Sequence, residues 1–438
     1  MTEQRQPVIV TSDAGGTMTD IFAIDEKGEF VVGKAPSTPH DASVGFMASL
    51  EDALSAWGHD GNGADAALES TQVAIFSGTM MLNTLLSRAG RRIGLIITRG
   101  FEDYSIVERA RQTYAGYSYS DRLHGATHQS NPPLVQRHHT RGVTERVDMF
   151  GEVVVPLHED ELRSGVEELL AQGVEGIAIC FLFSHVNATH EQRAKELARE
   201  VLDEAGSDIS IYVSHGIAPV MREYSRLNST LMEAYAADPA RWHLERCEEG
   251  LHSRGFKTGL LTVIASGGLV PVSHDRLYET IISGPVGGLF GAKHVADKLG
   301  LENVITSDLG GTSFDVGLLT AGQLPIIREP EVGNFWLNLP MVELRTIGAG
   351  AGSYVKVNEL TGRVEIGPES AGADPGPACY GMGSDQPTIL DCNVITGIID
   401  PANYLGGQVE IFPDKALDSI RRYVSDPLGI DPYTAAEG

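Results

Sequence analysis

Residues 12–20 read S-D-A-G-G-T-M-T-D, and residues 307–315 repeat the pattern as S-D-L-G-G-T-S-F-D. In both copies an apolar run enters a turn built on two adjacent glycines, and a second apolar run leaves it. The flanking residues predict, for each copy, a strand, a glycine turn, a strand, a hairpin turn and a third strand. In the second copy this third strand is expected at L-P-I-I, residues 324–327. A repeat so widely spaced predicts two domain-sized lobes rather than a solenoid.

Between the copies, strand-like runs alternate with helical patterns. The run I-A-I-C-F-L-F at residues 177–183 precedes an amphipathic segment at residues 191–206. Such alternation predicts an α/β fold with partly parallel, buried strands. We place a domain boundary where this helix ends, which gives residues 1–205 and residues 206–438. Residues 121–142 have turn formers and clustered His and Arg but no period, which predicts a long ordered loop.

Composition limits the classes of function. A chain of 438 residues, 42% hydrophobic and 21% charged, can bury a large core. A formal net charge of −26 argues against binding nucleic acid or an anionic membrane surface. The sequence shows no signal peptide, and its longest apolar run is too short to cross a bilayer. We expect a cytoplasmic protein, because the four widely spaced cysteines form no C-x-x-C pair and fit a reducing compartment.

The duplicated turns have the composition of phosphate sites. Glycine permits positive φ and lets an anion approach consecutive backbone N–H groups. Asp13 and Asp308 would repel a phosphate directly, so we interpret them as catalytic carboxylates that hold Mg²⁺ or its water ligands. The alternative is a pair of tight turns with no ligand. The residues predicted to bind phosphate are Gly15, Gly16, Thr17, Thr19, Gly310, Gly311, Thr312 and Ser313.

Two further glycine-rich segments follow different patterns. Residues 346–353, T-I-G-A-G-A-G-S, precede a β-hairpin pattern and not a helix, which excludes a dinucleotide-binding loop. Gly348, Gly350 and Gly352 are predicted either to contact a base or ribose, or to allow two backbones to pack closely. Residues 283–294, S-G-P-V-G-G-L-F-G-A-K-H, predict a helix whose glycines mark a hinge or a tight helix contact.

Together these motifs resemble the superfamily of actin, heat-shock ATPases, acetate kinases and sugar kinases. The resemblance implies a two-lobed fold that binds ATP between two phosphate hairpins. In this sequence those hairpins are residues 12–20 and 307–315. Residues 283–294 resemble the connecting helix of the superfamily, and residues 348–352 its adenosine segment.

Within that superfamily the chain resembles the hydantoinase A/5-oxoprolinase family. The most specific stretch is G-P-E-S-A-G-A-D-P-G-P-A-C-Y-G at residues 367–381. The resemblance covers essentially the whole chain, and because family members continue beyond residue 438 we expect a truncated subunit or a fragment. Met18 and Ser77 depart from the hydantoinase pattern, which usually has Phe and His there. These departures, with residues 100–148, are similar to nucleotide-binding subunits of ketone carboxylases, of the acetone type and more loosely the acetophenone type.

This resemblance implies an enzyme subunit that uses ATP and Mg²⁺ to activate a small ketone and bicarbonate. Other carboxylase subunits are implied as partners in a hetero-oligomer, one of which would hold a transition metal such as manganese where the carbon–carbon bond forms. Two alternatives remain open. One is ATP-dependent cleavage of a lactam or hydantoin, and the other is a non-enzymatic, actin- or chaperone-like ATP-binding module.

Histidines offer the other candidate catalytic residues. His138 and His139 lie near Arg137 and Arg141, so we predict either a role in binding phosphate or bicarbonate or a solvated loop. On an extended chain, adjacent side chains point in opposite directions, which argues against both histidines binding one ion. The H-x-x-x-x-H-E spacing at residues 185–191 is not that of a zinc motif and predicts an ordinary helix start. Cys379 is predicted to be a packed thiol.

Overall fold

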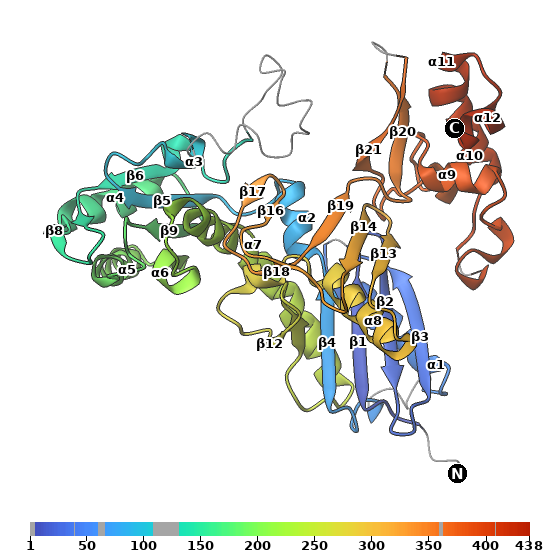
Figure 1. Ribbon diagram of the computed structural model, residues 1–438, viewed down its shortest axis with the longest axis horizontal. Helices are drawn as coiled ribbons and strands as arrows, with labels where there is room; N and C mark the ends of the chain where they lie inside the picture. Colours follow the sequence, from blue (N-terminus) through green and yellow to red (C-terminus); the bar gives the residue numbers. More distant parts are fainter. Residues whose placement is uncertain (1–4, 39, 60–65, 108–130, 359–361, 408) are drawn as a thin grey trace.

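The computed structural model describes residues 5–38, 40–59, 66–107, 131–358, 362–407 and 409–438. Figure 1 shows a large sheet at the lower right, an α/β lobe at the left, and a β-hairpin with a group of short helices at the upper right. This arrangement of strands and helices confirms the predicted α/β fold class. None of the described helices is long and apolar enough to cross a membrane.

The large sheet contains the first predicted hairpin. Its strands have the order β12-β11-β4-β1-β2-β3, with β4 parallel to β1 and the hairpin strands antiparallel. Helix α1 packs on β3, where Gly33 is required because a Cβ would overlap the backbone of Ser49. The first three strands confirm the prediction for the first copy. The bounds are β1 Ile9–Ala14, β2 Met18–Ile24, β3 Phe30–Pro36, β4 Val73–Gly78, β11 Leu261–Val263, β12 Leu269–Pro271 and α1 Ala42–Ser55.

A second sheet of four parallel strands forms the lobe at the left of Figure 1. Its order is β10-β9-β5-β6, and its two central strands, β9 and β5, are buried throughout as the sequence predicts. The chain enters this lobe after β4 and returns to the large sheet at β11, so the lobe is an insertion between two neighbouring strands. The bounds are β5 Ile93–Thr98, β6 Thr140–Val143, β7 Arg146–Val147, β8 Val153–Val155, β9 Gly176–Cys180, β10 Ser210–Val213, α3 Tyr104–Val107, α4 Glu159–Ala171, α5 Thr189–Glu204 and α6 Ser214–Ile217.

The sequence predicts a loop, a helix and a domain boundary in this part of the chain. Residues 121–130 lie outside the described residues, and the predicted loop is wrong for Thr140–Val143, which is strand β6 paired with β5. A four-residue strand is too short to show a period, so no sequence pattern indicates it. The helix predicted at residues 191–206 is confirmed by α5. A domain division at residue 206 stays a prediction; strand β10, just beyond it, pairs with β9.

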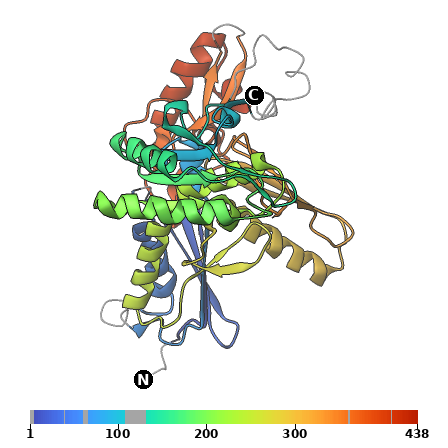
Figure 2. The same ribbon diagram turned by 90° about the vertical axis from the view of Figure 1, so that its left-hand side faces the viewer.

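Helix α7 (Glu223–Ser253) connects the two sheets. Its N-terminal half is buried against β9 and β10, and its C-terminal half packs on α1 of the large sheet. Figure 2, turned by 90°, shows α8 (Ser283–Leu299) on the other side of the large sheet from α1. Helix α8 ends at Gly300 in the left-handed conformation and leads into the second hairpin. Shorter elements in this region are α2 Met80–Leu86, η6 Arg137–His139 and η7 Leu277–Thr280.

The second predicted hairpin belongs to a smaller, three-stranded sheet. Strands β13 (Val304–Leu309) and β14 (Phe314–Leu319) pair with Asp308 opposite Asp315, in the register of the first hairpin. A strand does form within the expected residues 324–327, but it pairs with β18, and the strand that pairs with β14 is β19 (Leu344–Ile347). Pro325 has no N–H to donate to a ladder, which explains why the chain leaves the sheet there. The intervening strands are β15 Ile326–Ile327, β16 Glu331–Val332, β17 Phe335–Trp336 and β18 Met341–Val342.

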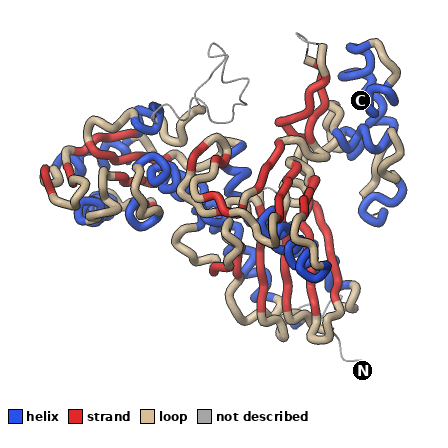
Figure 3. Tube along the Cα trace, viewed as in Figure 1, coloured by secondary structure: helices blue, strands red, loops and turns tan. Residues whose placement is uncertain are grey.

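The C-terminal part is a hairpin and a small helical group, which Figure 3 shows as one strand pair beside several short helices. Buried Asp391 organises it by accepting hydrogen bonds from the backbone N–H groups of Cys379 and Thr388. Cys379 is fully buried, as predicted for a packed thiol. The bounds are β20 Ser353–Val357, β21 Val364–Ser370, η8 Ala378–Tyr380, α9 Ile389–Ile395, η9 Pro401–Gly407, α10 Pro413–Ile420, η10 Arg421–Ser425, α11 Asp426–Leu428 and α12 Pro432–Glu437.

Candidate functional site

The first glycine turn is stabilised by its own backbone and by Ser37, the residue that follows β3. Gly15 N–H donates to the Met18 carbonyl at 2.9 Å and closes the turn. Ser37 donates its hydroxyl to the Gly15 carbonyl at 2.8 Å and its N–H to the Thr17 carbonyl at 2.9 Å. The N–H groups of Gly16 and Thr17 have no acceptor among the described residues. The turn therefore offers two fixed donors to an external anion.

The second glycine turn has the same backbone pattern. Gly310 N–H donates to the Ser313 carbonyl at 2.9 Å, which matches the bond from Gly15 to Met18. Within the part of the chain that the structure describes, Gly311 and Thr312 also have N–H groups without an acceptor. Ser313 uses its hydroxyl inside the fold, donating to Asp315 Oδ2 at 3.0 Å.

The structure brings the two turns into contact. A Cβ placed on Gly16 would lie 3.2 Å from Thr312 Cγ2, and one placed on Gly311 would overlap the Thr17 side chain. The four unpaired N–H groups of the two turns therefore lie at one junction between the lobes, as the duplication predicts. Thr19 does not join them, since it is buried and its hydroxyl lies 3.0 Å from Ser37 Oγ.

Helix α8 begins beside Asp13. The Ser283 hydroxyl donates to the Gly78 carbonyl at 2.7 Å, and the Gly78 N–H reaches back to the same hydroxyl at 2.9 Å. A Cβ on Gly284 would lie 2.6 Å from Asp13 Oδ1, so glycine is needed for the carboxylate to occupy this position. The other glycines of this helix, Gly287, Gly288 and Gly291, would meet nothing within 4 Å, so the predicted tight helix contact is wrong for them.

Carboxylates dominate the electrostatics of this junction. The Asp13 side chain keeps solvent-accessible surface, yet protein encloses it on several sides. This enclosure, with the nearby carboxylates of Asp308, Asp20 and Asp315, raises the pKa of Asp13 to about 6, and Lys34 partly opposes the shift. Burial likewise raises the pKa of Asp315, to which Asp308 contributes. The junction therefore favours a bound cation, which would relieve this repulsion.

These residues fit a magnesium ion that also binds phosphate. Mg²⁺ prefers hard oxygen ligands and is usually held by one or two carboxylates together with substrate phosphates and water. Asp13 and Asp308 supply such carboxylates. The described residues contain no group of three or more His, Cys, Asp or Glu side chains that could hold a metal ion by themselves. Any ion here would need ligands from a bound molecule.

The alternating glycines of residues 348–352 pack against the second turn. A Cβ on Gly350 would lie 2.6 Å from the Thr312 nitrogen, and one on Gly352 would lie 2.9 Å from the Gly311 carbonyl oxygen. Gly352 also donates its N–H to that carbonyl at 2.6 Å. Close backbone packing, one of the two predicted alternatives, is therefore what Gly350 and Gly352 allow here. A contact of Gly348 or its neighbours with adenosine stays a prediction.

His138 and His139 belong to η6 (Arg137–His139), which contacts β5 of the inserted lobe. They form a 3₁₀ turn with ring centroids 4.1 Å apart, so the extended geometry assumed from the sequence is wrong. Burial, with the positive field of Arg92 and Arg141, lowers the pKa of His139. Arg137 pairs with Asp103 at 2.5 Å, and Arg141 with Glu168 at 2.6 Å. These arginines are thus already neutralised by carboxylates, and a substrate role for the two histidines stays a prediction.

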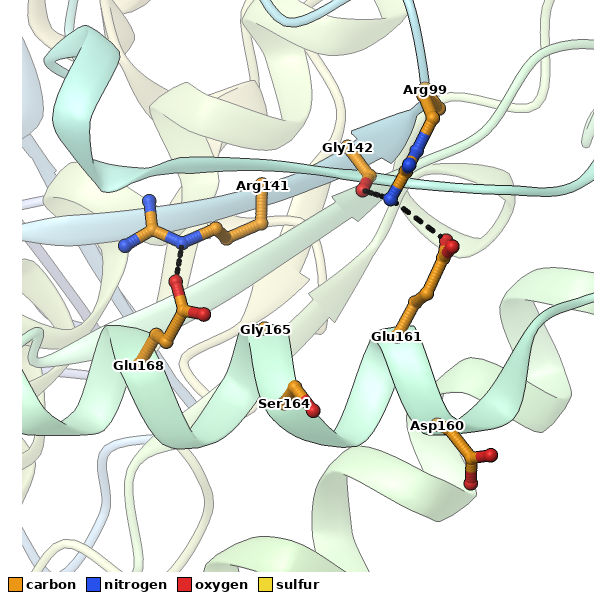
Figure 4. Close-up of a pocket in the computed structure, with 8 residues that line it drawn as sticks. All are labelled: Arg99, Arg141, Gly142, Asp160, Glu161, Ser164, Gly165 and Glu168. Carbon is orange, nitrogen blue, oxygen red and sulfur yellow. Dashed lines mark hydrogen bonds and ion pairs between the residues drawn. The ribbon is translucent and has the colours of Figure 1, made fainter.

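Figure 4 shows a cavity of about 330 Å³ in the same lobe, between β6 and α4. Arg99 lies 3.0 Å from Glu161 across its mouth, and Arg141 binds Glu168 on the opposite side. Both cations therefore face carboxylates, and the cavity offers no excess positive charge for an anion. Its lining residues are Arg99, Arg141, Gly142, Asp160, Glu161, Ser164, Gly165 and Glu168.

Sequence reasoning missed two residues near the glycine turns. Lys34 stands opposite Asp20 on β3 and binds it at 2.7 Å, which puts one cation beside the row of carboxylates. The only sequence sign of this cation was a lysine in the third strand of the first copy. Gly284 was noticed as part of a glycine cluster, but the sequence could not show which glycine faces Asp13.

Comparisons with known proteins place these features in a family. The family model described as hydantoinase/oxoprolinase N-terminal region matches residues 9–202, and the hydantoinase/oxoprolinase model matches residues 226–438. The acetone carboxylase beta subunit of Xanthobacter autotrophicus is 41% identical over 434 residues, which are 99% of this chain and 60% of that protein. The acetophenone carboxylase gamma subunit of Aromatoleum aromaticum is 35% identical over 97% of this chain and 58% of its own length.

Two solved structures share the fold. Nucleotide-free acetone carboxylase, from work on the mechanism of ATP-dependent acetone carboxylation, superposes with a TM-score of 0.91 at 41% identity, over 99% of this chain and 60% of that chain. The ATP-dependent caprolactamase of Pseudomonas jessenii gives a TM-score of 0.74 at 33% identity, over 98% of this chain and 60% of that chain. The chain thus spans about three fifths of the length of the two carboxylase subunits and of the caprolactamase subunit.

Proposed function

The chain belongs to the hydantoinase/oxoprolinase family, and from that premise we propose that it is the ATP-binding subunit of a ketone carboxylase. In this proposal it transfers a phosphoryl group from Mg·ATP to the enolate of a small ketone, to bicarbonate, or to both. The similarity to two ketone carboxylase subunits supports the choice of reaction. The observation that carries it is the contact between two glycine turns of the same D-x-G-G-T pattern, each with an aspartate at its entry.

The described residues suit phosphoryl transfer. Such a reaction depends mainly on positioning and on neutralising charge, because a P–O bond to the acceptor oxygen forms as the P–O bond to the nucleotide breaks. The N–H groups of Gly16, Thr17, Gly311 and Thr312 would bind phosphate oxygens. Asp13 and Asp308 would hold Mg²⁺, which neutralises charge on the phosphates when bound. Phosphorylation activates both reactants, since a ketone is a poor nucleophile and bicarbonate a poor electrophile.

Carbon–carbon bond formation is assigned to a partner subunit. The described residues lack a metal-binding cluster of their own, and the relatives are named as subunits. We therefore propose a hetero-oligomer in which another subunit holds a transition metal such as manganese. The cytoplasm is the proposed compartment. Because this chain has a net charge of −26, the partner surface that it meets should be locally basic.

A second candidate function is ATP-dependent opening of a lactam or hydantoin. The specific support is the likeness to caprolactamase. The same glycine turns would serve it, with an amide oxygen as the phosphoryl acceptor. The two candidates differ in the substrate that stimulates ATP consumption and not in the nucleotide site.

Phosphate release measured with the chain and its partner subunits distinguishes the candidates. Consumption of ATP that requires both a ketone and labelled bicarbonate, with label fixed into an acid-stable product, supports the carboxylase. Consumption stimulated by caprolactam, 5-oxoproline or hydantoin supports the second candidate. Turnover that ignores every small substrate would count against both and favour a non-enzymatic ATP-binding module.

A further inference from the structure

Helix α2 passes beside the first glycine turn. A Cβ placed on Gly16 would lie 3.9 Å from Asn83 Nδ2 and 3.2 Å from Thr312 Cγ2. The amide of Asn83 therefore reaches the point of the first turn that the second turn approaches from the other lobe. Nothing in the repeat itself supplies this amide, since α2 continues β4, which is outside the duplicated hairpin.

The packing of α2 fixes the direction of this side chain. Met81 and Leu85, one helical turn apart, are buried with 2% and 1% of their surface exposed, and Asn83 lies between them on the exposed face. Leu85 is held firmly, because a Cβ on Gly333 would lie 2.5 Å from Leu85 Cδ2. Rotation of α2 that removed Asn83 from the turn would therefore bring an apolar residue into water.

The amide keeps hydrogen-bonding capacity toward the turn. Asn83 Nδ2 donates to Thr79 Oγ1 at 3.2 Å, and a primary amide has two N–H donors, so one remains. No other partner of this side chain occurs among the described residues. Asparagine is also a poor helix former, and here it interrupts the apolar run M-M-L-N-T-L-L. The exposed amide of Asn83 is therefore able to donate to a ligand at the turn.

We propose that Asn83 is a nucleotide-binding residue that donates a hydrogen bond to a phosphate oxygen held by the N–H groups of Gly16 and Thr17. The inference rests on the proposed function, because it requires a phosphate group at the first turn. A neutral amide suits this position. It adds a third donor next to two backbone donors without bringing a charge that would pair with Asp13 or Asp20 and bind them in place of the ligand.

Titration of the chain with Mg·ATP and separately with adenosine tests the inference. Asn83→Ala should weaken ATP binding about tenfold to a hundredfold, as expected for one hydrogen bond to a charged acceptor. Asn83→Asp should weaken it further, because a carboxylate would face the phosphate. Adenosine affinity should stay unchanged in both variants. Thr84→Ala is the matched control, since its hydroxyl bonds only the Met80 carbonyl of its own helix, and it should bind ATP like the unmodified chain.

Several outcomes would overturn the inference. If both Asn83 variants bind ATP normally while Asp13→Asn does not, the inference fails and the proposed function stands. Equal losses of ATP and adenosine affinity would mean that Asn83 only supports the local structure. If the unmodified chain and its partner complex bind no ATP, the proposed function fails and the inference with it. Should Asn83→Asp not fold, as judged by circular dichroism, Asn83→Ser gives the same comparison with a shorter side chain that cannot reach the phosphate.

Discussion

The two glycine hairpins have the same turn and the same register but different neighbours. In the first, Asp13 lies between Ser77 of β4 and Asp20 of β2. In the second, Asp308 lies opposite Asp315, and β13 has no second neighbouring strand among the described residues. The first hairpin is therefore supported on both sides within a six-stranded sheet, whereas the second is supported on one side only.

The charges beside the turns differ as well. The row across the first hairpin continues from Asp20 to Lys34, and the equivalent row across the second continues from Asp315 to Thr346. Lys34 is an exposed cation that neutralises Asp20, while Thr346 donates a hydrogen bond to buried Asp315 at 2.6 Å. The two hairpins therefore share the backbone donors of their turns and both aspartates, and they differ in the residue beside the second aspartate, which is Lys34 in the first hairpin and Thr346 in the second.

The largest expected effect tests whether both hairpins are needed. Asp13→Asn and Asp308→Asn should each abolish Mg·ATP turnover in a coupled phosphate-release assay, because each removes a carboxylate proposed to hold the metal. Asp20→Asn is the matched control, since Asp20 is paired with Lys34 and should lose only a small part of the activity. Full activity in both single variants would refute a clamp formed from two sides.

A smaller effect on ATP affinity is expected when a methyl side chain is added to either turn. Gly311→Ala should reduce ATP affinity more than a hundredfold, because its Cβ would overlap Thr17 and force the turns apart. Gly16→Ala should reduce it only a few-fold, since its Cβ would lie 3.2 Å from the movable Thr312 side chain. Isothermal titration with Mg·ATP measures both. The reverse order of losses would show that the turns meet differently when nucleotide binds.

The pKa of Asp13 predicts a pH effect specific to the first hairpin. Because its pKa is raised from 3.8 to about 6, the contribution of Asp13 to the stability of the metal-free fold is greatest below about pH 4 and is lost as the pH rises from about 4 to about 6. Asp13→Asn removes this repulsion, so above pH 7 the variant should be more stable by about 1 kcal/mol, a discounted figure because solvent reaches the carboxylate. The two proteins should be equally stable at pH 4.

Urea denaturation from pH 4 to pH 8, without metal and with Mg²⁺, measures this difference. Added Mg²⁺ should restore stability to the unmodified chain and not to the variant. A stability difference that does not change with pH would contradict the shifted pKa.

Ser37, the residue that follows β3, supports the first turn by hydrogen bonds. Ser37→Ala removes hydrogen bonds to the Gly15 carbonyl and to Thr19 Oγ1, and should lower the free energy of unfolding by about 1–2 kcal/mol. Ser313→Ala removes one bond to Asp315 in the other hairpin and should cost about 1 kcal/mol or less. Thermal unfolding of both variants ranks the two. Equal losses of unfolding free energy would mean that side-chain hydrogen bonds stabilise the two turns equally.

Much of the architecture follows from local pattern. The glycine turns, their flanking strands and helix α5 are confirmed. Their patterns, alternating burial in strands and the helical period in α5, depend only on residues that are consecutive in the sequence. The third strand of the sheet that contains the second hairpin, β19, could not be found in this way. It pairs with β14 across a long stretch of intervening sequence. Residues 326 and 327 do form a strand, but Pro325 was the local sign that it would not join the ladder of the second hairpin.

In the candidate site, too, residues in a repeated local pattern could be predicted from sequence, and residues brought in by long-range contacts could not. Sequence identified Asp13, Asp308 and the adjacent glycines because they repeat. It assigned Thr19 a phosphate contact, although burial beneath the turn occupies its hydroxyl. Asn83 and Gly284 come from segments without a repeat, and only the fold shows that they lie beside the turns.

The insertion of a whole lobe between β4 and β11 has a consequence for biosynthesis. These two strands are neighbours in the large sheet, but the inserted lobe and most of α7 are translated between them. A nascent chain that has reached β4 exposes one open edge of the sheet until β11 emerges from the ribosome. The inserted lobe has its own parallel sheet and core, so it can fold during that interval. We therefore expect the first hairpin to need protection during synthesis, and the sheet that supports Asp13 to be completed late.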